Sequence, residues 1–139
     1  MATTIRPEVS IRNRYYIDKH RHYELKHFCL QYPKWKKAYT ETLDCDIPMS
    51  TIDGAYRSEG IYDPTSSRAI TRAYYSNRMQ LLEKVAKDAD KYLWQYILKA
   101  VTEGLSYTYL KTRLEIPCGK DMYYDRYRRF FWLLSEIRD

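Results

Sequence analysis

The chain has 139 residues, of which 45% are hydrophobic and 16% aromatic, and it carries a formal net charge of +6. This hydrophobic share excludes a disordered chain, and the length supports about one modest core. No apolar run approaches the roughly 20 residues that span a bilayer, and neither a signal-peptide core nor a disulfide framework is present, so we expect a cytoplasmic protein without a membrane partner.

The N-terminal third predicts an arm followed by a helix. Residues 1–14 have no clear hydrophobic period and are expected to form the arm. Asp18 can cap a helix over residues 20–31, because its carboxylate can accept hydrogen bonds from the first amides of a helix. The inward side chains of this helix should be Tyr23, Phe28 and Leu30.

Pro33 should end the first helix and begin a second one over residues 33–43, because proline fits the first turn of a helix but not its interior. The apolar face of this second helix is expected to carry Trp35, Ala38, Tyr39 and Leu43. Residues 44–63 are rich in turn-forming residues and predict a long connection.

Basic residues are concentrated in residues 1–40, which favours a polyanionic partner. The interpretation that these side chains grip phosphates and the interpretation that they form a solvated surface both stay open. The candidate phosphate contacts are Arg12, Arg14, Lys34, Lys36 and Lys37.

The pair Asp63 and Pro64 is typical of a helix start, with a capping carboxylate before a proline in the first turn. A long helix is expected to follow and to reach Lys87. Its apolar stripe should comprise Ile70, Tyr74, Leu81 and Val85, with Tyr75, Met79 and Leu82 beside them.

After a break at residues 88–90, a further helix is predicted through Leu93, Ile97 and Val101, which recur one turn apart. Gly104 should end that helix, since glycine tolerates the left-handed backbone of a C-terminal cap.

The last 35 residues predict a short helix, a tight turn and a long helix. Ser106 can cap the short helix, which should pack through Leu110 and Leu114. Within the turn, Ile116 is expected to be buried, Pro117 to stop the short helix, and Gly119 to supply a close or left-handed backbone.

In the final helix, apolar residues recur at spacings of three and four, with Asp121 placed favourably in the first turn. These apolar residues are Tyr123, Tyr127, Phe130, Leu134 and Ile137. Trp132 lies off this stripe, which suggests a homodimer contact or a surface for another protein.

The remaining faces carry the chemistry of a DNA-reading helix, because arginine can donate two hydrogen bonds to guanine while lysine and tyrosine hold phosphates. The candidate DNA contacts are Lys120, Asp121, Tyr124, Asp125, Arg128 and Arg129 on the last helix, with Ser106, Tyr107 and Lys111 on the short helix. A plain helical hairpin is the alternative that spacing alone leaves open.

The run over residues 103–134 resembles the sigma-factor region-4-like helix-turn-helix of phage late-gene activators of the RinA and ArpU type. The matching positions are Gly104, Ser106, Tyr107, Leu110, Leu114, Ile116 and residues 123–129. The distance from Ile116 to Met122 and Tyr123 is one residue longer than the usual pattern. The resemblance covers about residues 62–138 and implies a regulator of phage or prophage genes that binds double-stranded DNA and contacts host RNA polymerase.

We therefore expect an all-α protein of about five or six helices. Residues 1–62 should form the basic N-terminal segment and residues 63–139 a helical domain, with the helix-turn-helix over about residues 105–138. The predicted function is sequence-specific transcriptional regulation. Two alternatives are a small terminase-like DNA-packaging subunit and a helical protein-interaction module that does not bind DNA.

No enzyme motif is present, so we expect neither catalysis nor a cofactor. The cluster of His20, His22, His27 and Cys29 suggests zinc at first sight, but no second pair of ligands follows at a suitable spacing. We therefore expect no metal site, with the histidines at the surface and the cysteine half-buried.

Overall fold

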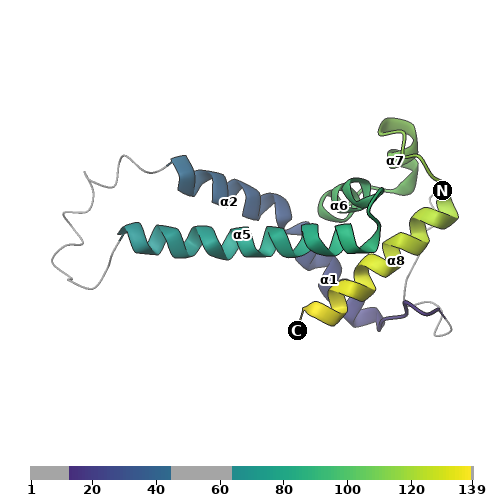
Figure 1. Ribbon diagram of the computed structural model, residues 1–139, viewed down its shortest axis with the longest axis horizontal. Helices are drawn as coiled ribbons and strands as arrows, with labels where there is room; N and C mark the ends of the chain where they lie inside the picture. The colour runs from purple at the N-terminus through teal and green to yellow at the C-terminus, as the bar shows by residue number, and fades with distance from the viewer. Residues whose placement is uncertain (1–12, 45–63, 139) are drawn as a thin grey trace. The chain divides into compact units, whose positions relative to one another are not determined.

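A computed structural model describes residues 13–44 and 64–138, and within them the secondary structure is entirely helical. The all-α prediction is confirmed. The helices are α1 (Lys19–Leu30), α2 (Tyr32–Asp44), α5 (Pro64–Ala89), α6 (Trp94–Glu103), α7 (Tyr107–Arg113) and α8 (Lys120–Ile137) (Figure 1). None of these helices has the length and apolar character needed to cross a membrane. The connection was predicted over residues 44–63, and Asp44 is instead the last residue of α2. Residues 45–63, which include the predicted cap Asp63, and most of the predicted arm lie outside the described residues.

The chain divides into two compact units. The first combines Met1–Gln31 with Leu81–Asp139, and the second is Tyr32–Gln80, so that α5 begins in the second unit and ends in the first. This division differs from the expected boundary after residue 62, because α1 packs against α6 and α8 instead of grouping with the segment that follows it in sequence.

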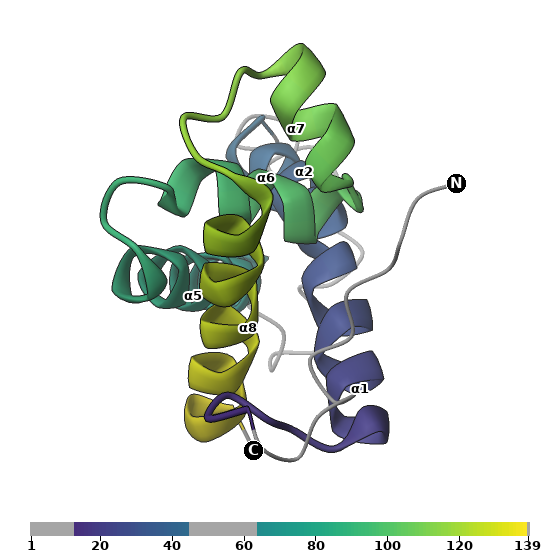
Figure 2. The ribbon, with the colours of Figure 1, turned by 90° about the vertical axis from the view of Figure 1, so that its right-hand side faces the viewer.

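The first unit is built on α1, α6 and α8, each of which packs against the other two, and α7 packs against α6. α1 and α8 lie side by side, and α6 contacts both of them as well as α7 (Figure 2). The core consists of apolar side chains from all four helices, from the end of α5 and from the turn before α8. Its most deeply buried members include Leu25, Cys29, Leu82, Val85, Ile97, Leu110, Ile116, Phe130, Phe131 and Leu134.

Several helix ends follow the local signals in the sequence. The Asp18 carboxylate accepts a hydrogen bond from the His20 amide at 2.9 Å at the start of α1. The Ser106 hydroxyl accepts one from the Tyr109 amide at 3.2 Å at the start of α7. Gly104 ends α6 with a left-handed φ of 71°, a conformation that costs other residues free energy.

The buried face of α1 differs from the predicted one. Tyr23, expected to point inward, is 37% exposed, and Leu30 is half-buried. His22, expected at the surface, is buried with its ring edge-on to Phe131 at a centroid distance of 4.9 Å. Cys29 is fully buried, not half-buried. The alternating polar and aromatic residues of α1 define no clear stripe, so its packing partner α8 decides which face is covered.

The predicted stripe of the last helix is correct in its centre. Tyr123, Phe130 and Leu134 are buried, and Tyr127 is half-buried. Ile137 is exposed because it is the last residue of α8, whereas Phe131, which the spacing did not single out, is buried against α1.

The second unit contains α2 and the first part of α5. Trp35 is buried, as predicted, and the Arg78 guanidinium lies 5.7 Å from the centroid of its indole ring. Arg72 donates a hydrogen bond to the Thr42 carbonyl at 3.0 Å. Ile70 is exposed over 68% of its surface, contrary to its place in the predicted stripe, and Tyr74 is half exposed.

Candidate nucleic-acid interface

The turn between α7 and α8 reverses the chain at Glu115, which takes a left-handed φ of 54°. The next amide, that of Ile116, donates to the Leu110 carbonyl at 3.1 Å, and the Ile116 side chain is fully buried. The left-handed residue therefore comes two residues after the end of α7, directly after the capping residue Leu114, and it turns Ile116 into the core. The sequence predicted the left-handed backbone four residues later, at Gly119, and this prediction was wrong.

Gly119 has ordinary backbone angles, with φ of −80° and ψ of 172°, and a Cβ atom built there would meet no atom within 4 Å. It precedes the first residue of α8, and its carbonyl accepts a hydrogen bond from the Tyr123 amide at 3.1 Å. Nothing in this geometry requires glycine.

Tyr107 links the two helices across the turn. Its hydroxyl donates a hydrogen bond to the Cys118 carbonyl at 2.7 Å. The centroid of its ring lies 5.6 Å from that of Tyr123 and 6.3 Å from that of Tyr124. Tyr107 and Tyr124, both predicted to contact DNA, are therefore half-buried in one aromatic cluster, and burial raises the pKa of the Tyr124 hydroxyl.

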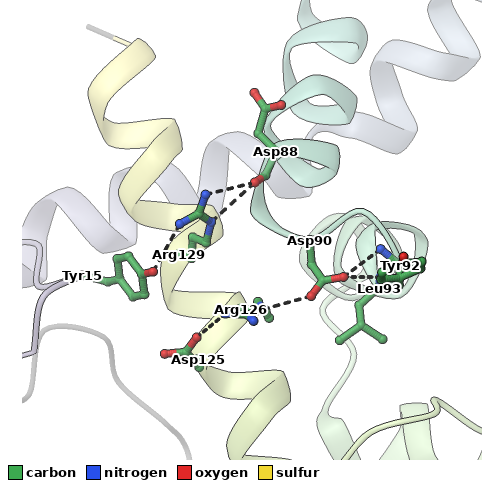
Figure 3. A network of polar contacts seen from close by, with 8 residues as sticks. All are labelled: Tyr15, Asp88, Asp90, Tyr92, Leu93, Asp125, Arg126 and Arg129. Carbon is green, nitrogen blue, oxygen red and sulfur yellow. Dashed lines mark hydrogen bonds and ion pairs between the residues drawn. The ribbon is translucent and has the colours of Figure 1, made fainter.

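Arg126 anchors α8 to the turn that precedes α6. Its guanidinium donates to Asp90 at 2.9 Å and to Asp125 at 2.7 Å (Figure 3). The second oxygen of Asp90 accepts hydrogen bonds from the amides of Tyr92 and Leu93, at 2.7 and 2.8 Å. Burial acts to raise the pKa of Asp90, but these amides and Arg126 outweigh it, so the pKa of Asp90 lies below its ordinary value.

Arg129 is also engaged within the fold. Its guanidinium donates to the Asp88 carbonyl at 3.4 Å and to the Tyr15 hydroxyl at 3.3 Å (Figure 3). The Tyr15 ring is 5% exposed and lies 5.9 Å from the ring of Trp132, which is half-buried. This predicted DNA contact therefore holds the segment before α1 against α8.

Three predicted basic contacts are not engaged within the described part of the fold. Lys111 on α7 and Lys120 at the start of α8 are exposed, and Arg128 is partly exposed. Within residues 13–44 and 64–138, none of the three has a hydrogen-bond or ion-pair partner. Asp121 is exposed in the first turn of α8, and Ser106 is exposed while its hydroxyl caps α7.

The predicted phosphate contacts are divided between the two units. Arg14, in the first unit, is exposed, and its guanidinium lies 4.7 Å from the centroid of the Tyr15 ring. Lys34, Lys36 and Lys37 are exposed on α2 in the second unit. Arg12 lies outside the described residues.

The cysteine and histidine side chains do not form a metal centre in the part of the chain that the structure describes, where no three potential ligands come together. Burial strongly raises the pKa of the Cys29 thiol and, to a smaller extent, that of Cys118. A protonated thiol is a poor metal ligand and a poor nucleophile.

No protein-family model, curated protein or solved structure matches this chain. The resemblance to the RinA and ArpU type therefore stays a prediction from the sequence. Because an all-helical fold is compatible with many functions, the functional argument depends on the surface of α7 and α8.

Proposed function

We propose that this protein is a sequence-specific, non-catalytic DNA-binding regulator of transcription, of phage or prophage type, that reads duplex DNA with the first half of α8. The observation that carries the proposal is the division among the cations of this region. Arg126 and Arg129 hold α8 in the fold, whereas Lys120, Lys111 and Arg128 face outward without a hydrogen-bond or ion-pair partner among the described residues.

Three polar side chains in the first half of α8 lie on one side of the helix. With about 100° between successive residues, Asp121, Asp125 and Arg128 fall opposite the buried Tyr123, Phe130 and Leu134. Helices that enter the major groove present mainly their N-terminal half to the bases. The first half of α8 therefore has the position and the polar side chains that base contact requires.

Each of these groups has a distinct task in the proposal. Arg128 donates to the acceptors of a guanine edge, and Asp121 or Asp125 accepts from a cytosine amino group. Lys111 and Lys120 bind phosphates and set the position of the helix on the duplex. The carboxylates repel phosphates, so they favour base readout over tight non-specific binding.

The resemblance to phage late-gene activators supports host RNA polymerase as a further partner. The position of Trp132 off the apolar stripe of α8 supports a second copy of the chain, and the sequence composition supports action in the cytoplasm. A terminase-like packaging subunit would instead assemble into rings. Light scattering on the full chain separates these proposals, since a ring has several times the mass of a monomer or dimer.

The engagement of Arg129 within the fold gives some support to the alternative of a protein-interaction module. That alternative predicts that Arg128 and Arg129 are both occupied by groups within the fold. Arg129 meets this condition through the Asp88 carbonyl and the Tyr15 hydroxyl, but Arg128 does not, since no described residue binds it. The outward position of Arg128 favours DNA reading.

Fluorescence anisotropy with duplex DNA across a salt series tests the proposal. We expect Arg128→Ala and Lys120→Ala each to weaken binding by about fivefold or more. In a plot of log affinity against log salt concentration, Lys120→Ala should also reduce the slope by about one, the amount expected for one lost phosphate contact. Lys99→Ala, which removes one positive charge from an exposed position on α6, is the matched control and should bind like wild type. Absence of binding at low salt by the folded protein would refute DNA binding and favour a protein partner.

A further inference from the structure

We propose that Tyr107 is a positioning residue for DNA sequence discrimination. In this inference, which rests on the proposed function, Tyr107 sets the first turn of α8 against α7 without touching DNA itself. Losing its hydroxyl should therefore reduce the preference for one sequence over another and leave the electrostatic part of binding unchanged.

The turn depends on a small number of fixed points. Ile116 is held by its burial and by the hydrogen bond that its amide donates to the Leu110 carbonyl. The Cys118 amide donates a hydrogen bond to the Ile116 carbonyl at 2.9 Å. The hydroxyl of Tyr107 then binds the Cys118 carbonyl at 2.7 Å, two residues before α8 begins. This bond ties the end of the turn back to the first residue of α7.

The ring of Tyr107 packs against the first turn of α8. It contacts Tyr123, which is almost fully buried, and Tyr124, which is half-buried. Lys120 and Asp121 belong to the helical turn that these two tyrosines complete. The position of Tyr107 thus fixes where the predicted base and phosphate contacts at the start of α8 lie.

The hydroxyl of Tyr107 is already committed. A tyrosine hydroxyl has one proton to donate, and here it goes to the Cys118 carbonyl. The group cannot also donate that proton to a phosphate while this bond lasts. A direct DNA contact, as expected from the sequence, is therefore replaced by an indirect role.

Base and phosphate contacts respond differently to a shift of the helix. Base hydrogen bonds need matched geometry, whereas the attraction of lysine to phosphates falls off gradually with distance. Loss of one hydrogen bond corresponds to roughly a threefold to tenfold change in an equilibrium constant. We expect a reduction of about this size in the ratio of specific to non-specific affinity.

The test compares Tyr107→Phe with wild type and with Tyr109→Phe. Tyr109 is exposed on the same helix, and its hydroxyl has no hydrogen-bond partner among the described residues. Affinities are measured for a duplex that wild type selects from a random pool and for a scrambled duplex, across a salt series. Alkylation of Cys118 by iodoacetamide, located by peptide mass mapping in the full chain, reports on the turn without DNA.

The expected result for Tyr107→Phe is a lower specificity ratio, an unchanged salt slope and faster alkylation of Cys118, with Tyr109→Phe like wild type. Equal weakening on both duplexes with a smaller salt slope would mean a direct phosphate contact and would overturn the inference. An unchanged ratio together with an unchanged alkylation rate would also overturn it. If wild type itself prefers no duplex, the proposed function fails, and the inference about discrimination fails with it.

Discussion

Two tyrosines at the junction of α7 and α8 differ in what their hydroxyl groups contact. The Tyr107 hydroxyl donates to a backbone carbonyl, whereas that of Tyr123 is buried and has no hydrogen-bond partner in the described part of the chain. Burial, followed by the neighbouring Tyr127 and Tyr124, raises the pKa of Tyr123. A buried hydroxyl without a partner is a cost to the folded state.

Tyr123→Phe should therefore leave the free energy of unfolding unchanged or raise it by up to about 1 kcal/mol, because the ring contacts stay and the buried hydroxyl is removed. Tyr107→Phe should lower it by about 1 kcal/mol through the loss of a hydrogen bond. Urea unfolding followed by circular dichroism measures both. A loss of stability in Tyr123→Phe larger than in Tyr107→Phe would contradict this assignment.

The three arginines in the middle of α8 have different partners, although the residue type is the same. Arg126, Arg128 and Arg129 lie within four residues and have the same side chain. Arg126 binds Asp90, Arg129 binds the Asp88 carbonyl and Tyr15, and Arg128 binds no described residue. These partners are 36 to 114 residues away along the chain, so no local pattern identifies them.

At the scale of elements, the placement of α8 depends on its attachment to the turn between α5 and α6. Asp90 joins these parts, since one oxygen caps the backbone before α6 and the other accepts from Arg126. Its side chain is 8% exposed, so the interaction is shielded from solvent more than an ordinary surface pair.

Because folding lowers the pKa of Asp90, its ionised form stabilises the folded state at neutral pH, and this contribution is lost as pH falls through the folded-state pKa. Asp90→Asn should lower the free energy of unfolding at pH 7 by about 1–2 kcal/mol, since it weakens a charge-assisted bond. In unfolding measured from pH 7 to pH 3, the difference in stability between variant and wild type should stay constant down to about pH 4 and shrink as the pH falls further. A difference that does not depend on pH would contradict this role for Asp90.

Helix boundaries were predictable because their signals are local. Asp18, Pro33, Gly104 and Ser106 act on backbone groups within a few residues of themselves, and the structure places helix ends where they predict. The regular spacing of Leu93, Ile97 and Val101 likewise identified a face that is buried.

Helix faces were harder to predict where two faces of similar polarity compete. His22 is buried in place of Tyr23 because Phe131 of α8 packs on it, and this contact joins residues 109 positions apart. The left-handed residue also escaped prediction. Glycine usually takes this conformation, but here it falls on Glu115, where the burial of Ile116 imposes it.

For the whole molecule, the division into two units assigns the candidate interface to one of them. α7 and α8 belong to the first unit, together with Arg14 and the Asp90 junction. The lysines of α2 belong to the second unit, and their predicted phosphate contacts form a separate hypothesis. If α8 reads DNA, replacing Arg128 should change the sequence preference of the protein, whatever the lysines of α2 contribute.

Selection of duplexes from a random pool by the full-length protein, followed by sequencing, tests this claim most directly. We expect wild type to enrich a defined motif containing a guanine, and Arg128→Ala to lose the preference at that position while keeping preferences elsewhere. Lys99→Ala should enrich the wild-type motif. Enrichment of no motif by wild type, or of the same motif by Arg128→Ala, would contradict the account of α8 as the DNA-reading helix.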